Sequence, residues 1–153
     1  MSALVEKDLE DSVATLLRDR LPGVRVVTSW SQADDGTVKG VETPSDSILI
    51  AVAAGAPTWD AYLVPSCSIP VALAITIRRE TAPDAAALAT VMEPIANLLL
   101  AMQLDVDACE PLTSVNFSAD GVRLDGGDPP QYNSTSAVWR VSRSFTVRGV
   151  INQ

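Results

Sequence analysis

The sequence predicts an α+β fold in which two helices pack on one face of a mostly antiparallel sheet, with long polar loops. Two segments, residues 3–21 and 81–103, carry apolar residues at helical spacing, and the closing segment alternates between apolar and polar residues as a half-buried strand does. Shorter segments typical of strands lie between them. Because strands separate the helices and the tail is predicted to be β, helices and sheet form two layers. The length of 153 residues indicates one domain over residues 1–153.

The first third of the chain contains one helix and two strands. An apolar stripe predicts the helix over residues 3–21, and Pro22-Gly23 ends it. Residues 24–30 are typical of a strand, and residues 31–47 form a long polar loop of the kind that is often functional. Residues 48–54 are apolar on both sides, which favours a central strand.

A strong strand is predicted over residues 69–79. One of its faces carries Val71, Leu73, Ile75 and Ile77, whereas the other carries the small residues Ala72, Ala74 and Thr76. We expect a helix to lie close against the small residues.

The second helix is predicted over residues 81–103. Thr81 and Asp84 form a variant of the capping box at its start. Pro94 lies inside the helix and removes one backbone hydrogen bond, so we expect a kink near residues 90–94 or two abutting helices.

The tail is predicted to be β. Residues 112–118 are typical of a strand, Asp120-Gly121 of a hairpin turn, and residues 122–124 of a short returning strand. A polar loop over residues 125–134 then leads to the closing strand, residues 137–151. In that strand Trp139, Val141, Phe145 and Val147 point to the core, whereas Arg140, Ser142, Ser144, Thr146 and Arg148 face solvent.

Composition excludes several classes of function. The chain has no histidine, which removes Ser–His and Cys–His catalysis and the histidine-containing zinc sites. It has no glycine-rich phosphate loop, and its net charge of −8 disfavours binding to nucleic acid. We therefore expect no enzyme activity, no cofactor and no bound metal. Asp120, Asp125 and Asp128 lack the spacing and the terminal Glu of a calcium loop and are more typical of a solvated turn.

Charge and loop placement point to contacts with other proteins. Residues 130–153 contain three arginines and no acid, so the closing strand suits an acidic partner, including another copy of this chain. We expect Arg140 or Arg148 to pair with Glu6, Glu10 or Asp11 of a neighbouring copy. The same arginines also fit a solvated face. The candidate interface residues are Trp30, Asp34, Asp35, Trp59, Asp125, Asp128, Arg140, Thr146 and Arg148.

The order of elements resembles that of a known family. An N-terminal amphipathic helix (Val5 to Leu21) ends in Leu21-Pro22-Gly23, strands follow, then a long mid-chain helix, a loop, and a closing strand with a tryptophan (Trp139 to Gly149). This arrangement is similar to the tail terminator, or tail completion, proteins of long-tailed bacteriophages and related phage-derived particles. The resemblance covers most of the chain and rests on element order and size.

The resemblance implies a structural virion protein that forms a hexameric ring. The ring would cap the tail tube protein and join it to the head–tail connector protein, and genomic DNA would pass through its lumen without specific binding. Assembly would take place in the host cytoplasm, with no membrane partner, and the product would lie in the tail or neck of the virion. Alternatives are another head–tail joining or neck protein, a generic α+β adaptor or binding domain, and, last, a hydrolase that works without histidine.

Overall fold

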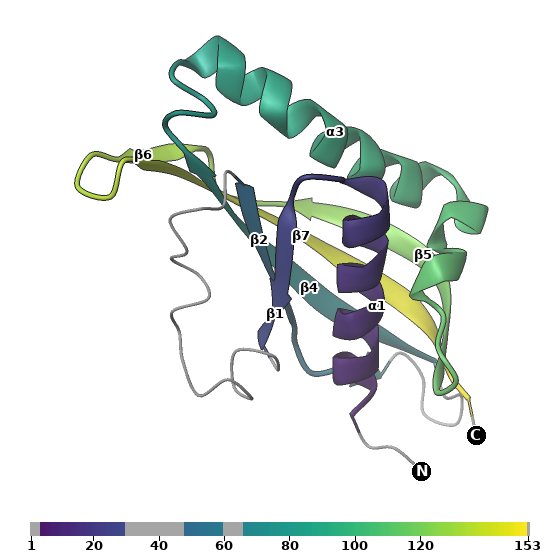
Figure 1. Cartoon of the computed structure of the whole chain (residues 1–153). Helices are drawn as coiled ribbons and strands as arrows, with labels where there is room; N and C mark the ends of the chain where they lie inside the picture. Colours follow the sequence, from purple (N-terminus) through teal and green to yellow (C-terminus); the bar gives the residue numbers. More distant parts are fainter. Residues whose placement is uncertain (1–3, 30–47, 60–65, 153) are drawn as a thin grey trace.

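The computed structural model describes residues 4–29, 48–59 and 66–152 of the chain. Its elements are shown in Figure 1. In chain order they are α1 (Val5–Arg20), β1 (Arg25–Thr28), β2 (Ile48–Ala54), β3 (Thr58–Trp59), β4 (Ser66–Arg78), α3 (Ala85–Leu104), the 3₁₀ helix η2 (Val106–Leu112), β5 (Phe117–Gly126), β6 (Gln131–Asn133) and β7 (Val138–Ile151).

The strands of the described residues form one sheet in the order β1-β2-β4-β7-β5, with β3 added beside β4 and β6 beside β7. Only the pair β1–β2 is parallel, and the other pairs are antiparallel. Strands β4 and β7 pair along almost their whole length, from Ser66–Val150 to Arg78–Val138. The mostly antiparallel α+β fold is therefore confirmed, and β2 lies inside the sheet as predicted.

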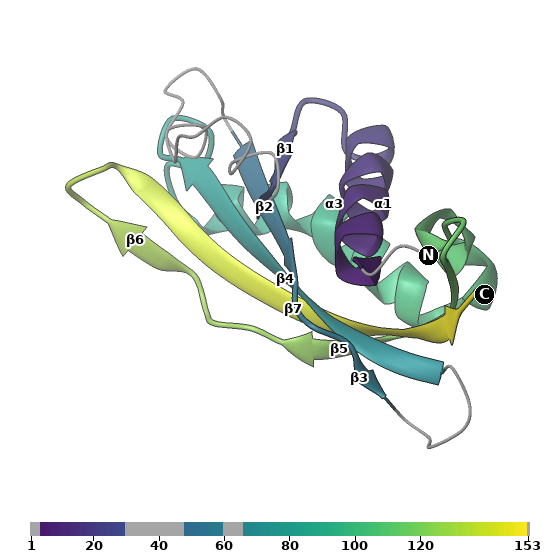
Figure 2. The ribbon, with the colours of Figure 1, turned by 90° about the horizontal axis from the view of Figure 1, so that it is seen from below.

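Both helices lie on the same side of the sheet (Figure 2). The side chains buried beneath them are the large ones: Leu73 and Ile75 of β4 and Phe145 of β7 are fully buried. The expectation that a helix covers Ala72, Ala74 and Thr76 was wrong, because helices bury more apolar surface against branched and aromatic side chains than against alanine. The small residues lie on the opposite side, where Ala72 and Ala74 are exposed.

Helix α3 begins later than the capping box predicts. Asp84, rather than Thr81, is its N-cap, and the Asp84 carboxylate accepts a hydrogen bond of 2.8 Å from the backbone N–H of Ala87. The helix runs without interruption through Pro94, so the alternative of two abutting helices was wrong. A single helix lets Met92 and Ile95, on either side of this proline, both reach the core.

The predicted turn at Asp120-Gly121 is instead part of one strand. Strand β5 runs from Phe117 to Gly126, and its register against β7 shifts between Ala119 and Gly121, as a β-bulge does. A bulge absorbs the extra residue while the chain keeps its direction, so no hairpin forms. The predicted loop over residues 125–134 also contains β6, which pairs with the first residues of β7.

Candidate assembly surface

The side of the sheet away from the helices is a broad, polar surface of small side chains. Cross-strand partners share a face, so the register of β4 and β7 fixes which residues lie there. We call this surface the outer sheet face. Its central residues are Ser68, Pro70, Ala72, Ala74 and Thr76 of β4 and Arg140, Ser142, Ser144, Thr146 and Arg148 of β7.

At one end of this face, β5 and β7 hold an ion pair on their surface. The Arg123 Nε lies 2.8 Å from Asp125 Oδ1, and the Thr146 hydroxyl donates a hydrogen bond of 2.6 Å to Asp125 Oδ2. The hydrogen bond from Thr146, and after it the one from Arg123, holds the pKa of the Asp125 carboxyl below its ordinary value. Both carboxylate oxygens thus accept bonds from protein donors, so the side chain is fixed in place.

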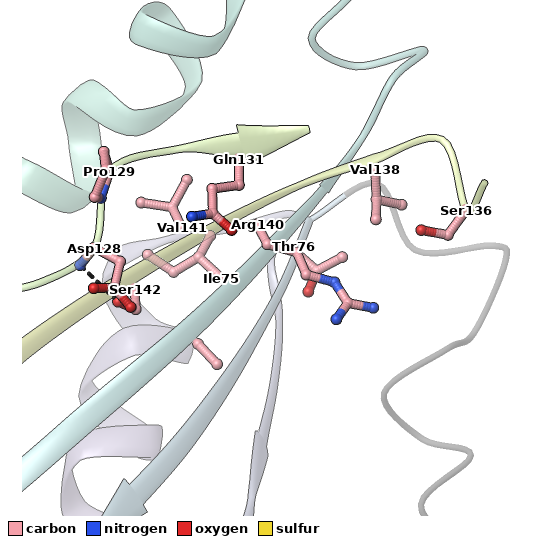
Figure 3. A pocket seen from close by; sticks show the side chains of 11 residues that line it. Ile75, Thr76, Asp128, Pro129, Gln131, Ser136, Val138, Arg140, Val141 and Ser142 are labelled. Atoms are coloured by element: carbon pink, nitrogen blue, oxygen red, sulfur yellow. Dashed lines mark hydrogen bonds between the residues drawn. The ribbon is translucent and has the colours of Figure 1, made fainter. Parts of the chain in front are cut away.

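At the other end, the chain between β5 and β6 borders a hollow on the outer sheet face (Figure 3). The backbone N–H of Asp128 donates a 2.8 Å hydrogen bond to Ser142 Oγ, which ties this segment to β7. Arg143 adds a 3.1 Å bond from Nη1 to the Asp128 carbonyl oxygen. Arg140 also lines the hollow, and Figure 3 shows its guanidinium pointing away from Asp128. The two predicted residues share one hollow but do not meet.

The remaining predicted interface residues are scattered. Arg148 is exposed and follows Thr146 on the outer sheet face, whereas Trp59 lies on β3, with 57% of its surface exposed. Trp30, Asp34 and Asp35 lie outside the described residues.

One predicted partner of these arginines was wrong. Glu10 is completely buried, and its Oε1 accepts hydrogen bonds from Ser29 Oγ (2.7 Å) and from the backbone N–H of Ala54 (2.9 Å). It connects α1 to the chain after β1 and to the end of β2. A carboxylate in that position cannot reach a neighbouring copy. Asp11 is exposed, but Lys7 of the same helix already lies 3.1 Å from it.

Sequence reasoning missed the exposed side of α3. Glu93 is the only charged residue from Ala85 to Leu104. Leu100 and Leu104 are 46% and 73% exposed. By length and composition alone the helix is long and apolar enough to cross a membrane, and only 22% of its most apolar 18-residue stretch is buried in the protein. A helix that is apolar on most sides is normally buried. The sequence does contain this information, because the residues outside the apolar stripe of α3 include only one charged side chain.

The ionisable side chains of the described residues do not form a metal centre. No group of three or more histidine, cysteine or acidic side chains among them could hold a metal ion. Cys67 and Cys109 are both buried, and neither forms a disulfide within the described residues. Burial, followed by the charges of Asp105 and Asp120, raises the pKa of the Cys109 thiol, which makes it a poor nucleophile.

Comparison with known proteins finds a similar fold in a solved virion particle. No protein-family model matches the sequence, and no curated protein does. The fold is similar to that of a chain in the virion of a native gene transfer agent particle. The TM-score is 0.63 over 97% of this chain and 99% of the other, at 11% sequence identity. At that identity the likeness shows a shared fold from end to end.

Proposed function

We propose that this chain is a structural virion protein that acts as a tail terminator. Its copies form a ring, hexameric as in the family that it resembles, which caps the tail tube and joins it to the head connector. The observation that carries the proposal is the match to a chain of the gene transfer agent virion, which spans 97% of one chain and 99% of the other. A match of that extent relates two whole subunits rather than a shared motif. The terminator role itself is proposed because the order of elements resembles that of the tail terminator family.

The chemistry of the chain supports a role in assembly. It contains no histidine for acid–base catalysis at neutral pH. On the outer sheet face Arg140 and Arg148 are exposed and Arg123 is paired with Asp125, whereas the exposed acids Asp84, Glu93 and Asp105 belong to α3 or flank it on the opposite side. The arginines of β7 and the acids of α3 have opposite charges, which favours association of these two surfaces in a fixed orientation.

The proposal places the protein in the tail or neck of a virion assembled in the host cytoplasm, with no membrane partner. Its partners are the tail tube protein, the head–tail connector protein and other copies of itself. Genomic DNA passes through the ring, and the net charge of −8 keeps phosphates from adhering to it.

Tube growth tests this function directly. Purified tail tube protein from the same particle is allowed to polymerise with and without this chain, and the products are examined by electron microscopy. We expect shorter tubes that carry an extra ring at one end, in an amount that rises with the added protein. Tubes of unchanged length with bare ends would contradict the proposal.

A further inference from the structure

We propose that the exposed side of α3 in one copy packs on the outer sheet face of the next copy. This contact rests on the proposed function, because it specifies how the subunits of the ring meet. The two surfaces lie on opposite sides of the subunit, as Figure 2 shows for α3 and the sheet. A contact between two different surfaces of the same chain is head-to-tail, and it closes into a ring when the rotation between copies allows.

The two surfaces have compatible shapes. The outer sheet face carries Pro70, Ala72 and Ala74, all exposed, beside Ser142 and Ser144. Small side chains rise little above the strands, so a helix can approach them closely. The exposed side of α3 is also mostly small or apolar; its outward residues include Ala86, Ala89, Thr90, Glu93, Asn97, Leu100 and Leu104. Leu100 and Leu104 would supply the apolar surface that the contact removes from water.

The charges at the ends of the two surfaces have opposite signs and similar spacing. Arg140 and Arg148 lie eight residues apart on β7, which is about 27 Å along a strand. The caps of α3, Asp84 and Asp105, lie 21 residues apart, which is about 31 Å along a helix. An arginine near Asp105 would also meet the negative end of the helix dipole. Each end of the helix can therefore face an arginine of the next copy.

Addition of a strand at the β5 edge of the sheet is a less suitable way to join copies. The outer edge of β5 is partly occupied, because Gln103 Oε1 accepts a 2.7 Å hydrogen bond from the Leu124 N–H and Thr113 Oγ1 accepts one of 3.2 Å from the Ala119 N–H. A strand from another copy would have to displace both side chains. Edges blocked in this way resist pairing with other chains.

A membrane is a less suitable occupant of the exposed side of α3. The helix and its caps carry acids and no basic residue, whereas helices that lie on a membrane surface are usually rich in lysine and arginine. Met92, Ile95 and Leu99 of the same helix are buried against the protein core, so insertion would expose that core. Lipid binding is therefore an outcome that the experiment must separate from self-association.

The contact is small, which sets the expected affinity. A helix about 30 Å long and about 10 Å wide covers roughly 300 Å² of a flat partner. A stable pair needs about 800 Å² per partner. A single contact is therefore weak, and ring closure, in which every subunit uses both surfaces, is needed to hold the copies together. Self-association should appear at high protein concentration or on the end of a tube.

Cysteine cross-linking tests the contact. Asn97→Cys places a thiol midway along the exposed side of α3, and Ala72→Cys places one opposite Ser144, midway between Arg140 and Arg148. With a short bismaleimide at high protein concentration, the double variant should give a ladder of oligomers that ends at the ring. Each single variant should give dimers at most, because the native thiols are buried and each subunit then has one reactive thiol. The control pair Asn97→Cys with Thr15→Cys, both on the helical side, should give no ladder.

Each outcome has a definite meaning. A ladder from the Asn97–Ala72 pair alone supports the contact, and Arg140→Glu combined with Arg148→Glu should then weaken it about tenfold, since exposed pairs contribute up to about 1 kcal/mol each. Rings seen by electron microscopy without that ladder would overturn the contact and leave the proposed function standing. Neither rings nor a ladder, on tubes or in solution, would overturn both. Flotation of the protein with phosphatidylcholine vesicles, without a ladder, would assign the exposed side of α3 to lipid.

Discussion

The substitution Gly149→Ala tests how tightly β5 and β7 pack beneath the outer sheet face. A Cβ at this position would overlap the carbonyl oxygen of Ser118 and would lie 2.5 Å from Cζ of Phe117. Carbon atoms in contact normally lie about 3.5 Å apart, so one strand would have to move by about 1 Å. Phe117 is fully buried and its ring has no free space to enter, and the other obstacle is backbone.

Overpacking of this kind costs about 1–3 kcal/mol. Because the new Cβ would clash with both the Ser118 carbonyl and the Phe117 ring, we expect a loss of about 3 kcal/mol in the free energy of unfolding. For a chain of this size that corresponds to a fall of about 6–12 °C in the melting temperature. The measurement is urea unfolding followed by circular dichroism, at one fixed protein concentration, since self-association would shift the midpoint.

Gly121→Ala is the matched control, because Gly121 lies on β5 opposite Arg148 and a Cβ there would meet no atom within 4 Å. Its unfolding free energy should stay within about 0.5 kcal/mol of that of the wild type. Each kcal/mol corresponds to roughly 2–4 °C in melting temperature, so a Gly149→Ala variant that melted within about 2 °C of the wild type would contradict the described packing of β5 on β7. An equal loss of stability in Gly121→Ala would contradict it as well.

Three further predictions concern single side chains. Asp84→Ala should lower the unfolding free energy by about 1 kcal/mol through loss of the α3 N-cap, whereas Asp84→Asn should restore most of it. Thr146→Val should raise the pKa of Asp125 in a carboxyl NMR titration, because Thr146 and Arg123 lower that pKa in the folded protein. The ionised Asp125 therefore stabilises the fold above its ordinary pKa of 3.8, and this stabilisation is lost as the pH falls through the folded pKa. The difference in unfolding free energy between the variant and the wild type should therefore shrink below about pH 4. Cys109 should react with iodoacetamide at neutral pH only after unfolding, since it is buried and its pKa is raised, and mass spectrometry of the native protein that found it alkylated at the rate of a free thiol would contradict its placement.

Much of the fold was predictable because periodicity reports burial directly. The alternation in β7 and β4 placed Phe145 and Leu73 in the core, and both are fully buried. The apolar stripe of α1 likewise appears as a buried face. What periodicity does not report is which side of a sheet the helices cover. The small residues of β4 were assigned to the helical side, but it is the large ones that are buried there.

Local turn chemistry misled in the tail for a similar reason. Asp120-Gly121 is a strong hairpin signal by itself, but pairing of β5 with the long β7 keeps the strand continuous through a bulge. Tertiary pairing of this kind is not encoded within a few residues. The burial of Glu10 was equally hidden, because its partners Ser29 and Ala54 are distant in the sequence and meet only in the folded chain.

Part of the candidate surface followed from the sequence. The polar alternation of β7 gave Arg140, Thr146 and Arg148, which do lie on the outer sheet face. Arg123 was missed as the partner of Asp125, because residues 122–124 were assigned to a short strand returning along residues 112–118 and Asp125 to the loop after it. The exposed side of α3 was missed because the prediction followed the apolar stripe of the helix and gave no role to the residues outside it.

The mass and shape of the assembled protein decide whether its copies form a ring. Native mass spectrometry over a range of protein concentrations, with electron microscopy of the same samples, would measure both. We expect a closed ring of uniform diameter with about six times the subunit mass, in free solution at high concentration or at the end of a tail tube. A single subunit mass under every condition, with no ring on the tubes, would contradict it.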